Sequence, residues 1–161
     1  MSETTGEAEA WNRALQYLAR RSRSAAQVKE HLQRQGHPVD VVDRVIDRLR
    51  GRGWIDDVAY ARRWLERRVE AGRTSIWRAR WELTRQGVRG EDIDRALAAI
   101  PKDWEKQAAI RWLRFHRRRH RNNDLTTWRA KAYRGLMQNG FDRDLAFSLV
   151  ASWDDEQMGG G

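Results

Sequence analysis

The sequence contains no cysteine, only two prolines and no long apolar run. Without cysteine the chain forms neither a disulfide framework nor a thiolate metal site, and this composition suits a reducing compartment. A membrane helix needs about 18 or more consecutive apolar residues, and none are present. The acidic opening MSETTGEAEA is also unlike a signal peptide. We therefore expect a soluble, cytoplasmic protein that does not bind membranes.

Motifs that carry catalysis or cofactor binding are missing as well. The sequence has no GxGxxG, GxxxxGK[ST], HExxH or calcium-loop pattern. Asp56 and Asp57 would suit a metal-dependent nuclease, but a helix cap followed by a first-turn acid explains both. His116, His120 and Asp124 are spaced four residues apart, yet the surrounding arginines would repel a cation. We predict that the protein is not an enzyme and holds no cofactor or metal.

Positive charge is abundant and concentrated in one part of the chain. The formal net charge is +9, and residues 102–135 hold 11 Lys/Arg against 3 acids. Residues 136–161 hold one basic residue and five acids. Most of the basic residues are arginines, which bind phosphate or carboxylate bidentately. A concentrated basic segment of this kind is typical of proteins with a polyanionic partner. The nine tryptophans are expected mostly in the core.

Helical spacing runs through the whole chain, and no alternating strand pattern stands out. The first apolar face consists of Trp11, Ala14, Leu15 and Leu18. Ser24 and Gln27 then form a capping box that begins a second helix, which Gly36 ends. Pro38 suits the first turn of a third helix. Its inner face would consist of Val42, Val45, Ile46 and Leu49.

The same pattern recurs twice more. Gly36, Gly87 and Gly140 are 51 and 53 residues apart, and a leucine precedes each by four residues. Matching apolar residues occur eight before each glycine and six, nine, ten and thirteen after it. Periodicity of this kind is typical of tandem repeats. We predict an all-α fold, a tandem array of three three-helix units that forms an elongated, curved molecule.

The repeat boundaries are set by two junctions. In the segment GWIDD, Gly53 closes one helix, Asp56 caps the next, and Ile55 can pack against Tyr60 as a hydrophobic staple. A second break falls near Pro101. We therefore expect a flexible start at 1–10, repeats at 11–53, 54–101 and 102–153, and a flexible tail at 154–161.

A helix predicted over residues 103–121 is amphipathic. Its apolar side carries Ala108, Ala109, Trp112, Leu113 and Phe115. Its polar side carries an arginine stripe, Arg111, Arg114, Arg118 and Arg121. Solvated helix faces usually mix signs, because pairs of opposite charge at i,i+4 each add about 0.3–0.5 kcal/mol. No acid falls between Glu105 and Asp124, so the stripe suits an anionic partner; an ordinary solvated face is the alternative.

The second repeat mixes arginine with tryptophan. Ile76, Ala79 and Leu83 define its inner face, so at least one of Trp77 and Trp81 is expected to be partly exposed. Exposed tryptophan beside arginine is typical of protein-binding hot spots and of base-stacking platforms. The alternative is a tryptophan that folds down to cover a neighbouring repeat.

The segments ALQYLARRSRSAAQVKEHLQRQG, VIDRLRGRGWIDDVAYARRWLERR and RARWELTRQGVRGEDIDRAL resemble the RecX family of recombination regulators. The similarity is specific over residues 14–100 and looser to about residue 153. It implies a cytosolic, non-enzymatic array of three-helix units that binds the RecA recombinase filament on DNA. It further implies inhibition of ATP hydrolysis and strand exchange, and contact between the basic opening stretch and the filament. The long basic segment RRRHRNND and the tryptophan pair depart from the pattern expected for the family.

On this basis we expect a monomeric negative regulator of homologous recombination and DNA repair. It would bind the RecA–DNA filament in its groove or at its end and contact nucleic acid directly or within the filament. The alternative is a helix-turn-helix protein that binds DNA without RecA, although its third helices carry many acids. The predicted contact residues for RecA or DNA are Arg73, Arg78, Arg80, Trp81, Arg85, Arg111, Arg114, Arg117, Arg118, Arg119, Arg121 and Lys131.

Overall fold

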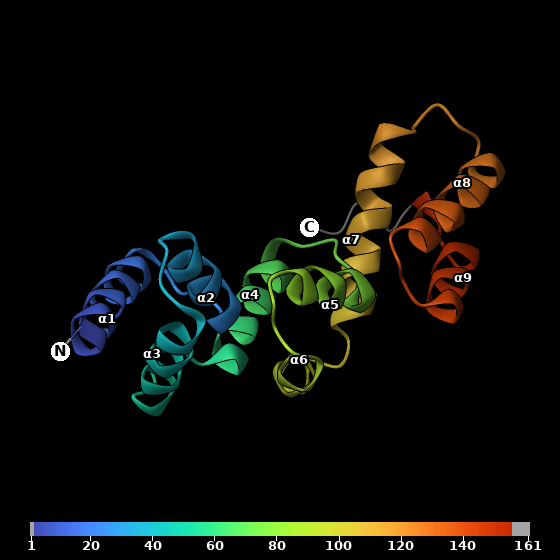
Figure 1. Ribbon diagram of the computed structural model, residues 1–161. Coiled ribbons are helices and arrows are strands. Elements are labelled where there is room, and N and C mark those ends of the chain that lie inside the picture. The colour runs from blue at the N-terminus through green and yellow to red at the C-terminus, as the bar shows by residue number, and fades with distance from the viewer. Residues whose placement is uncertain (1, 156–161) are drawn as a thin grey trace. The chain divides into compact units, whose positions relative to one another are not determined.

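The computed structural model describes residues 2–155, which form nine helices and no strand (Figure 1). This confirms the predicted all-α class. In chain order the helices are α1 (Ser2–Arg20), α2 (Ala25–Arg34), α3 (Val39–Gly51), α4 (Asp57–Ala71), α5 (Ile76–Arg85), α6 (Gly90–Leu97), α7 (Trp104–Arg119), α8 (Leu125–Gln138) and α9 (Arg143–Ala151). None of the described helices is both long and apolar enough to span a membrane.

The helices are distributed over two compact units. The first unit contains the chain up to residue 64 together with 82–99, and the second contains 65–81 together with the chain from 100 onward. Within the first unit α1, α2 and α3 pack against one another, and within the second α7, α8 and α9 do so. Helices α4 and α5 contribute residues to both units. The repeat boundaries at 53 and 101 remain a prediction.

The repeat positions read from the sequence form the cores. Val28, Ala79 and Ala132 are fully buried, and so are the leucines that precede each repeat glycine by four residues. The predicted inner face of α3 is buried along its whole length. Gly36, Gly87 and Gly140 have positive φ values of 86°, 80° and 78°, as a helix ending in a left-handed residue requires. These predictions are confirmed.

The predicted helix starts are also formed. The Ser24 hydroxyl accepts a hydrogen bond from the Gln27 N–H while the Gln27 side chain accepts one from the Ser24 N–H, which is the expected capping box. Asp56 accepts a bond of 3.0 Å from the Ala59 N–H and so caps α4. Pro38 is the N-cap of α3, one position before the expected first turn. Ile55 and Tyr60 are both buried.

The structure describes parts of both segments that the sequence predicted to be flexible, and their flexibility stays a prediction. Helix α1 begins at Ser2, and its Glu7 forms ion pairs with Arg44 and Arg48 on α3 at 3.2 and 2.8 Å. Near the other end Asp155, in the expected flexible tail, forms an ion pair with Arg117 at 2.8 Å. The rest of that expected tail lies outside the described residues.

In each unit, hydrogen bonds connect the start of a short helix to a glycine turn and to an acid that lie far away in the chain. We call each of these sets of contacts a joint. In the first unit Ser24 donates through its hydroxyl to the Gln86 carbonyl oxygen at 2.8 Å. The Ala25 N–H, at the start of the same helix, donates to Asp57 at 2.8 Å. Gly87 lies so close to Ala26 that a Cβ added to the glycine would be 2.1 Å from the Ala26 Cβ.

The second unit has the matching joint. Ser75 donates to the Asn139 carbonyl oxygen at 2.7 Å, and the Ile76 N–H donates to Glu105 at 3.2 Å. Gly140 is packed against the Trp77 ring. Each joint therefore connects the start of a short helix to a glycine turn and to an acid in the first turn of another helix, Asp57 of α4 or Glu105 of α7.

Candidate basic and aromatic interface

The tryptophans of α5 are on the surface. Trp77 is 58% exposed and Trp81 is 44% exposed, so the prediction that at least one would be partly exposed is confirmed. Their exposure follows from the inner face of the helix, since Ala79 and Leu83 are fully buried. Arg78 and Arg85 are exposed on the same helix, and Arg80 is half-buried. Helix α5 thus presents aromatic rings and guanidinium groups together.

The arginines of α7 do not form one continuous face. Arg118 and Arg119 are exposed at the end of the helix, while Arg111 and Arg114 are half-buried. Arg121 is exposed but lies beyond the last residue of α7. The arginine stripe of the sequence analysis is therefore divided, and only its C-terminal part is open to solvent.

Phe115 differs most from its predicted position. It was expected on the apolar side of the helix, but its side chain is 41% exposed. The buried side of α7 is formed by Ala108, Ala109 and Leu113, and a residue two positions after Leu113 faces away from it. The ring is instead covered by arginines: the Cζ of Arg73 lies 3.8 Å from its centroid and that of Arg119 lies 5.3 Å away. We call Arg73, Phe115 and Arg119 the arginine–phenylalanine cluster.

A backbone contact holds Arg73 beside α7. The Arg111 Nε donates a hydrogen bond of 2.8 Å to the carbonyl oxygen of Gly72, in the segment that joins α4 to α5. The Arg111 side chain therefore holds the segment that carries Arg73 next to α7 instead of extending into solvent. The guanidinium of Arg73 can then stack on Phe115 with little freedom left to lose, which favours binding of an anion.

Arg117 belongs to the interior of the second unit. It is only 8% exposed, and two of its nitrogens donate to the two carboxylate oxygens of Asp155 at 2.8 Å. A third nitrogen donates to the carbonyl oxygens of His120 and Asn123. The bonds to Arg117 hold the pKa of Asp155 below its ordinary value. This arginine, predicted as a contact for RecA or DNA, fixes the turn after α7 and presents no guanidinium to a partner.

The histidines in the same segment take part in packing. The Trp128 indole N–H donates to the His116 Nδ1 at 3.0 Å, and the His116 ring stacks on Trp112 with 4.7 Å between centroids. Burial, and then the neighbouring His120, lower the pKa of His116. Asp124 caps α8 through the Thr127 N–H at 2.9 Å. Within residues 2–155 no group of three His, Cys, Asp or Glu side chains is arranged to hold a metal.

Lys131, the last of the predicted contact residues, is exposed on α8. Together with Arg118, Arg119 and Arg121 it gives the second unit exposed positive charge. The arginine–phenylalanine cluster and the exposed Trp77 and Trp81 belong to the same unit. Side chains of these kinds can pair with phosphate or carboxylate groups and stack against flat apolar groups. Residues 2–155 thus form an all-helical protein whose second unit exposes basic and aromatic side chains.

Comparison with known proteins agrees with this class and makes it more specific. A family model described as "RecX, first three-helix domain" matches residues 10–49. The regulatory protein RecX of Mycolicibacterium smegmatis is 34% identical over 153 residues, covering 91% of this chain and 80% of the relative. That of Mycobacterium marinum is also 34% identical and covers 92% and 87%. The chain therefore belongs to the RecX family of regulatory proteins.

Relatives differ in length. The regulatory protein RecX of Lacticaseibacillus paracasei is 30% identical over 146 residues, but the chain spans only 59% of its length. Among solved structures, a crystal structure of regulatory protein RecX has a TM-score of 0.85 at 24% identity and covers 94% of this chain and 74% of the other. RecX from Lactobacillus salivarius has a TM-score of 0.84 at 17% identity, covering 92% and 96%. At these identities the structural similarity establishes the fold alone.

Proposed function

We propose that the protein is a cytoplasmic negative regulator of homologous recombination that binds the RecA filament on DNA and acts by binding, without catalysis. Membership of the RecX family supports a regulatory role. The observation that carries the choice of surface is the arginine–phenylalanine cluster, where Arg73 lies 3.8 Å from the Phe115 ring centroid. Bound to the filament, it inhibits ATP hydrolysis and strand exchange.

The cluster is suited to a partner that combines negative charge with flat groups. A guanidinium stacked on a ring keeps its N–H edges available for bidentate hydrogen bonds to phosphate or carboxylate. A recombinase filament on DNA offers phosphates, acidic side chains and bases within one groove. The exposed rings of Trp77 and Trp81 on α5 add apolar contact area of the kind that dominates protein-binding hot spots.

Direct DNA binding without the recombinase is the second candidate. The exposed tryptophans and arginines would also suit stacking on single-stranded bases. A helix-turn-helix mode is disfavoured at α6, because Arg89 and Arg95 both lie near the buried Asp92, at 3.5 and 3.7 Å. Arginines that lie beside an acid of the same segment have less charge to offer to phosphates.

The deciding experiment is RecA's ATPase on single-stranded DNA with this protein titrated in at physiological salt. We expect inhibition well below the concentration that coats the DNA. The triple variant Arg73→Gln, Arg118→Gln, Arg119→Gln should lose that inhibition, since it removes exposed guanidinium groups from one surface. A matched control, Arg34→Gln with Arg50→Gln and Arg62→Gln, removes the same charge from exposed arginines of the first unit.

Wild-type potency in the folded triple variant would contradict the role of the cluster. Equal loss in both triple variants would show that net charge alone matters. Inhibition only where the DNA is saturated, with a DNA affinity that falls steeply as salt rises, would favour direct DNA binding over binding to the filament.

A further inference from the structure

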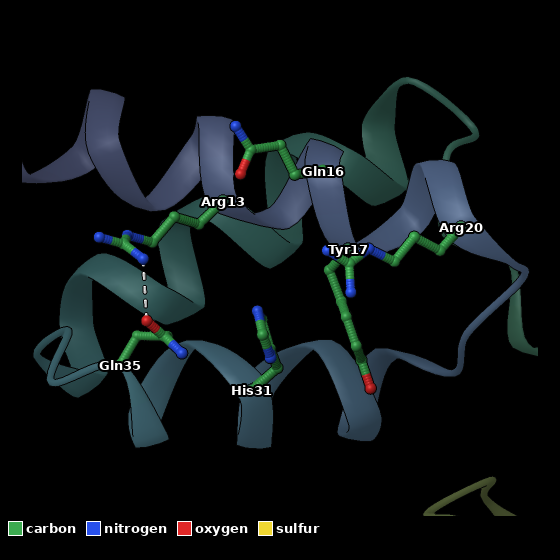
Figure 2. A pocket seen from close by; sticks show the side chains of 6 residues that line it. All are labelled: Arg13, Gln16, Tyr17, Arg20, His31 and Gln35. Carbon is green, nitrogen blue, oxygen red and sulfur yellow. Dashed lines mark hydrogen bonds between the residues drawn. The ribbon is translucent and has the colours of Figure 1, made fainter.

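A second basic site lies on the first unit, far along the chain from the arginine–phenylalanine cluster. A pocket of about 190 Å³ opens between α1 and α2. It is lined by Arg13, Gln16, Tyr17, Arg20, His31 and Gln35 (Figure 2). Pockets that hold whole small molecules usually measure about 300–1,000 Å³, so this one fits a single chemical group.

The pocket has an aromatic wall. The rings of Tyr17 and His31 are stacked, with 4.0 Å between centroids and 5° between planes. The Cζ of Arg23 lies 4.3 Å from the Tyr17 ring centroid. Figure 2 shows the His31 side chain pointing from α2 toward α1. Stacking on Tyr17 limits the freedom of the imidazole to turn away.

Hydrogen-bond donors outnumber acceptors around this space. None of the six lining residues is acidic, and the amide oxygen of Gln35 is already occupied by an Arg13 Nη1 at 2.9 Å. Arg13 also pairs with Glu9 at 3.0 Å, so its charge is partly balanced. Arg20, the other cation of the lining, is exposed in the last turn of α1. The lining is therefore suited to a ligand with several acceptor oxygens and negative charge.

The electrostatic state of His31 agrees with this geometry. Burial is the main cause that lowers its pKa, followed by the positive charges of Arg13, Arg20, Arg23 and Arg34. Two of these arginines are paired with acids at i,i+4 spacing, Arg13 with Glu9 and Arg34 with Glu30. Positive potential thus persists at His31 despite both pairs, and an anion would neutralise it.

We propose that this pocket binds one phosphate group, held by Arg20, Arg13 and the His31 imidazole beside the Tyr17 ring. Phosphate is favoured over carboxylate because it offers more acceptor oxygens to a lining whose six side chains all carry hydrogen-bond donors. The phosphate belongs either to a nucleic-acid strand or to a free polyphosphate. The proposal is independent of the filament-binding role assigned to the second unit.

The test is an NMR titration of the His31 imidazole in the full-length protein, with inorganic pyrophosphate and, separately, a short oligothymidylate. Binding of either should raise the pKa of His31, because a nearby anion favours the protonated ring. Arg20→Gln should weaken binding about threefold to tenfold through loss of one charge-assisted contact. The control Arg50→Gln removes an exposed arginine of the same unit that lies outside the pocket and should leave the affinity unchanged.

The outcomes separate the two sources. Tight oligothymidylate binding that pyrophosphate displaces would identify a nucleic-acid strand, and saturable binding of pyrophosphate alone would identify a free polyphosphate. The proposal is overturned if neither probe moves the His31 signals. It is also overturned if Arg20→Gln and Arg50→Gln weaken binding equally, or if only a glutamate-rich peptide acts.

Discussion

The Ser24 hydroxyl donates a hydrogen bond of 2.8 Å to the backbone carbonyl of Gln86, 62 residues later in the chain. Ser75 makes the same contact with Asn139 across 64 residues, at 2.7 Å. Both serines also cap their own helices, since Ser24 accepts from the Gln27 N–H and Ser75 from the Arg78 N–H. One side chain thus closes a helix end and fastens it to a distant turn.

Ser24→Ala should therefore cost more than the loss of an ordinary cap. The variant removes a cap worth about 1 kcal/mol and leaves the Gln86 carbonyl without its donor, so we expect a total loss of about 2–3 kcal/mol in the free energy of unfolding. Asp142→Ala is the control, because Asp142 caps only α9, through the Leu145 N–H. Chemical denaturation of both variants measures the difference. Equal losses would mean that the bond to Gln86 contributes nothing.

Alanine substitutions at the three repeat glycines distinguish the cost of a left-handed backbone from the cost of overpacking. Gly36 has a φ of 86° and open space around it, so Gly36→Ala should cost only the left-handed penalty of about 1–2 kcal/mol. Gly87→Ala adds a Cβ at 2.1 Å from the Ala26 Cβ, and overpacking brings a further loss of about 1–3 kcal/mol. Gly140→Ala meets the exposed Trp77 ring, which can shift, so its cost should fall between the other two. Thermal unfolding gives the order, and a Gly36 variant as unstable as the Gly87 variant would contradict it.

Asp57 stabilises the first joint by accepting a hydrogen bond from the Ala25 N–H, and its negative charge contributes less. Burial raises the pKa of Asp57, and the bond from the Ala25 N–H opposes that rise only in part. An amide oxygen can accept the same bond, so Asp57→Asn should be at least as stable as the natural protein at pH 7. Asp57→Ala loses the acceptor and should cost about 1–2 kcal/mol.

The raised pKa of Asp57 also predicts how the stability of the protein changes with pH. A carboxyl whose pKa is raised on folding favours the folded state most below its ordinary value of 3.8. That contribution is lost as the pH rises through the raised pKa of the folded protein. The stability of the natural protein relative to Asp57→Asn should therefore fall as the pH rises above about 4, and denaturation at several pH values measures it. A relative stability that increases over this range would contradict the assignment.

Local rules predicted much of the fold. Helix periodicity located Val28, Leu32 and their counterparts in the core, and the left-handed preference of glycine located the helix ends at Gly36 and Gly140. These features depend on neighbours within about two turns of helix, so a single sequence contains them. The all-α class of the fold followed from the same patterns.

The candidate site was less predictable, because its geometry depends on partners far along the chain. Arg117 is paired with Asp155, 38 residues later, and nothing in helical spacing indicates that bond. Arg111 reaches Gly72 across 39 residues, which turns a residue of the arginine stripe into a support for Arg73. The exposure of Phe115 was within reach of the sequence, since it is two positions from Leu113 on a helix. Whether the remaining residues contact RecA or DNA stays a prediction.

Two neighbouring arginines should therefore respond in opposite ways to replacement. Arg117→Met removes bonds to Asp155, His120 and Asn123 and should lower the free energy of unfolding by about 1–3 kcal/mol. Arg118→Gln, at an exposed position, should leave stability unchanged but weaken inhibition of RecA's ATPase. Because Arg117 lowers the pKa of Asp155, their pairing stabilises the fold fully above pH 3.8 and fails as the pH falls through the lowered value. Acid denaturation of Arg117→Met should lack that pH-dependent contribution. An Arg118→Gln variant that loses as much stability as Arg117→Met would contradict the placement of Arg117 in the interior and Arg118 on the surface.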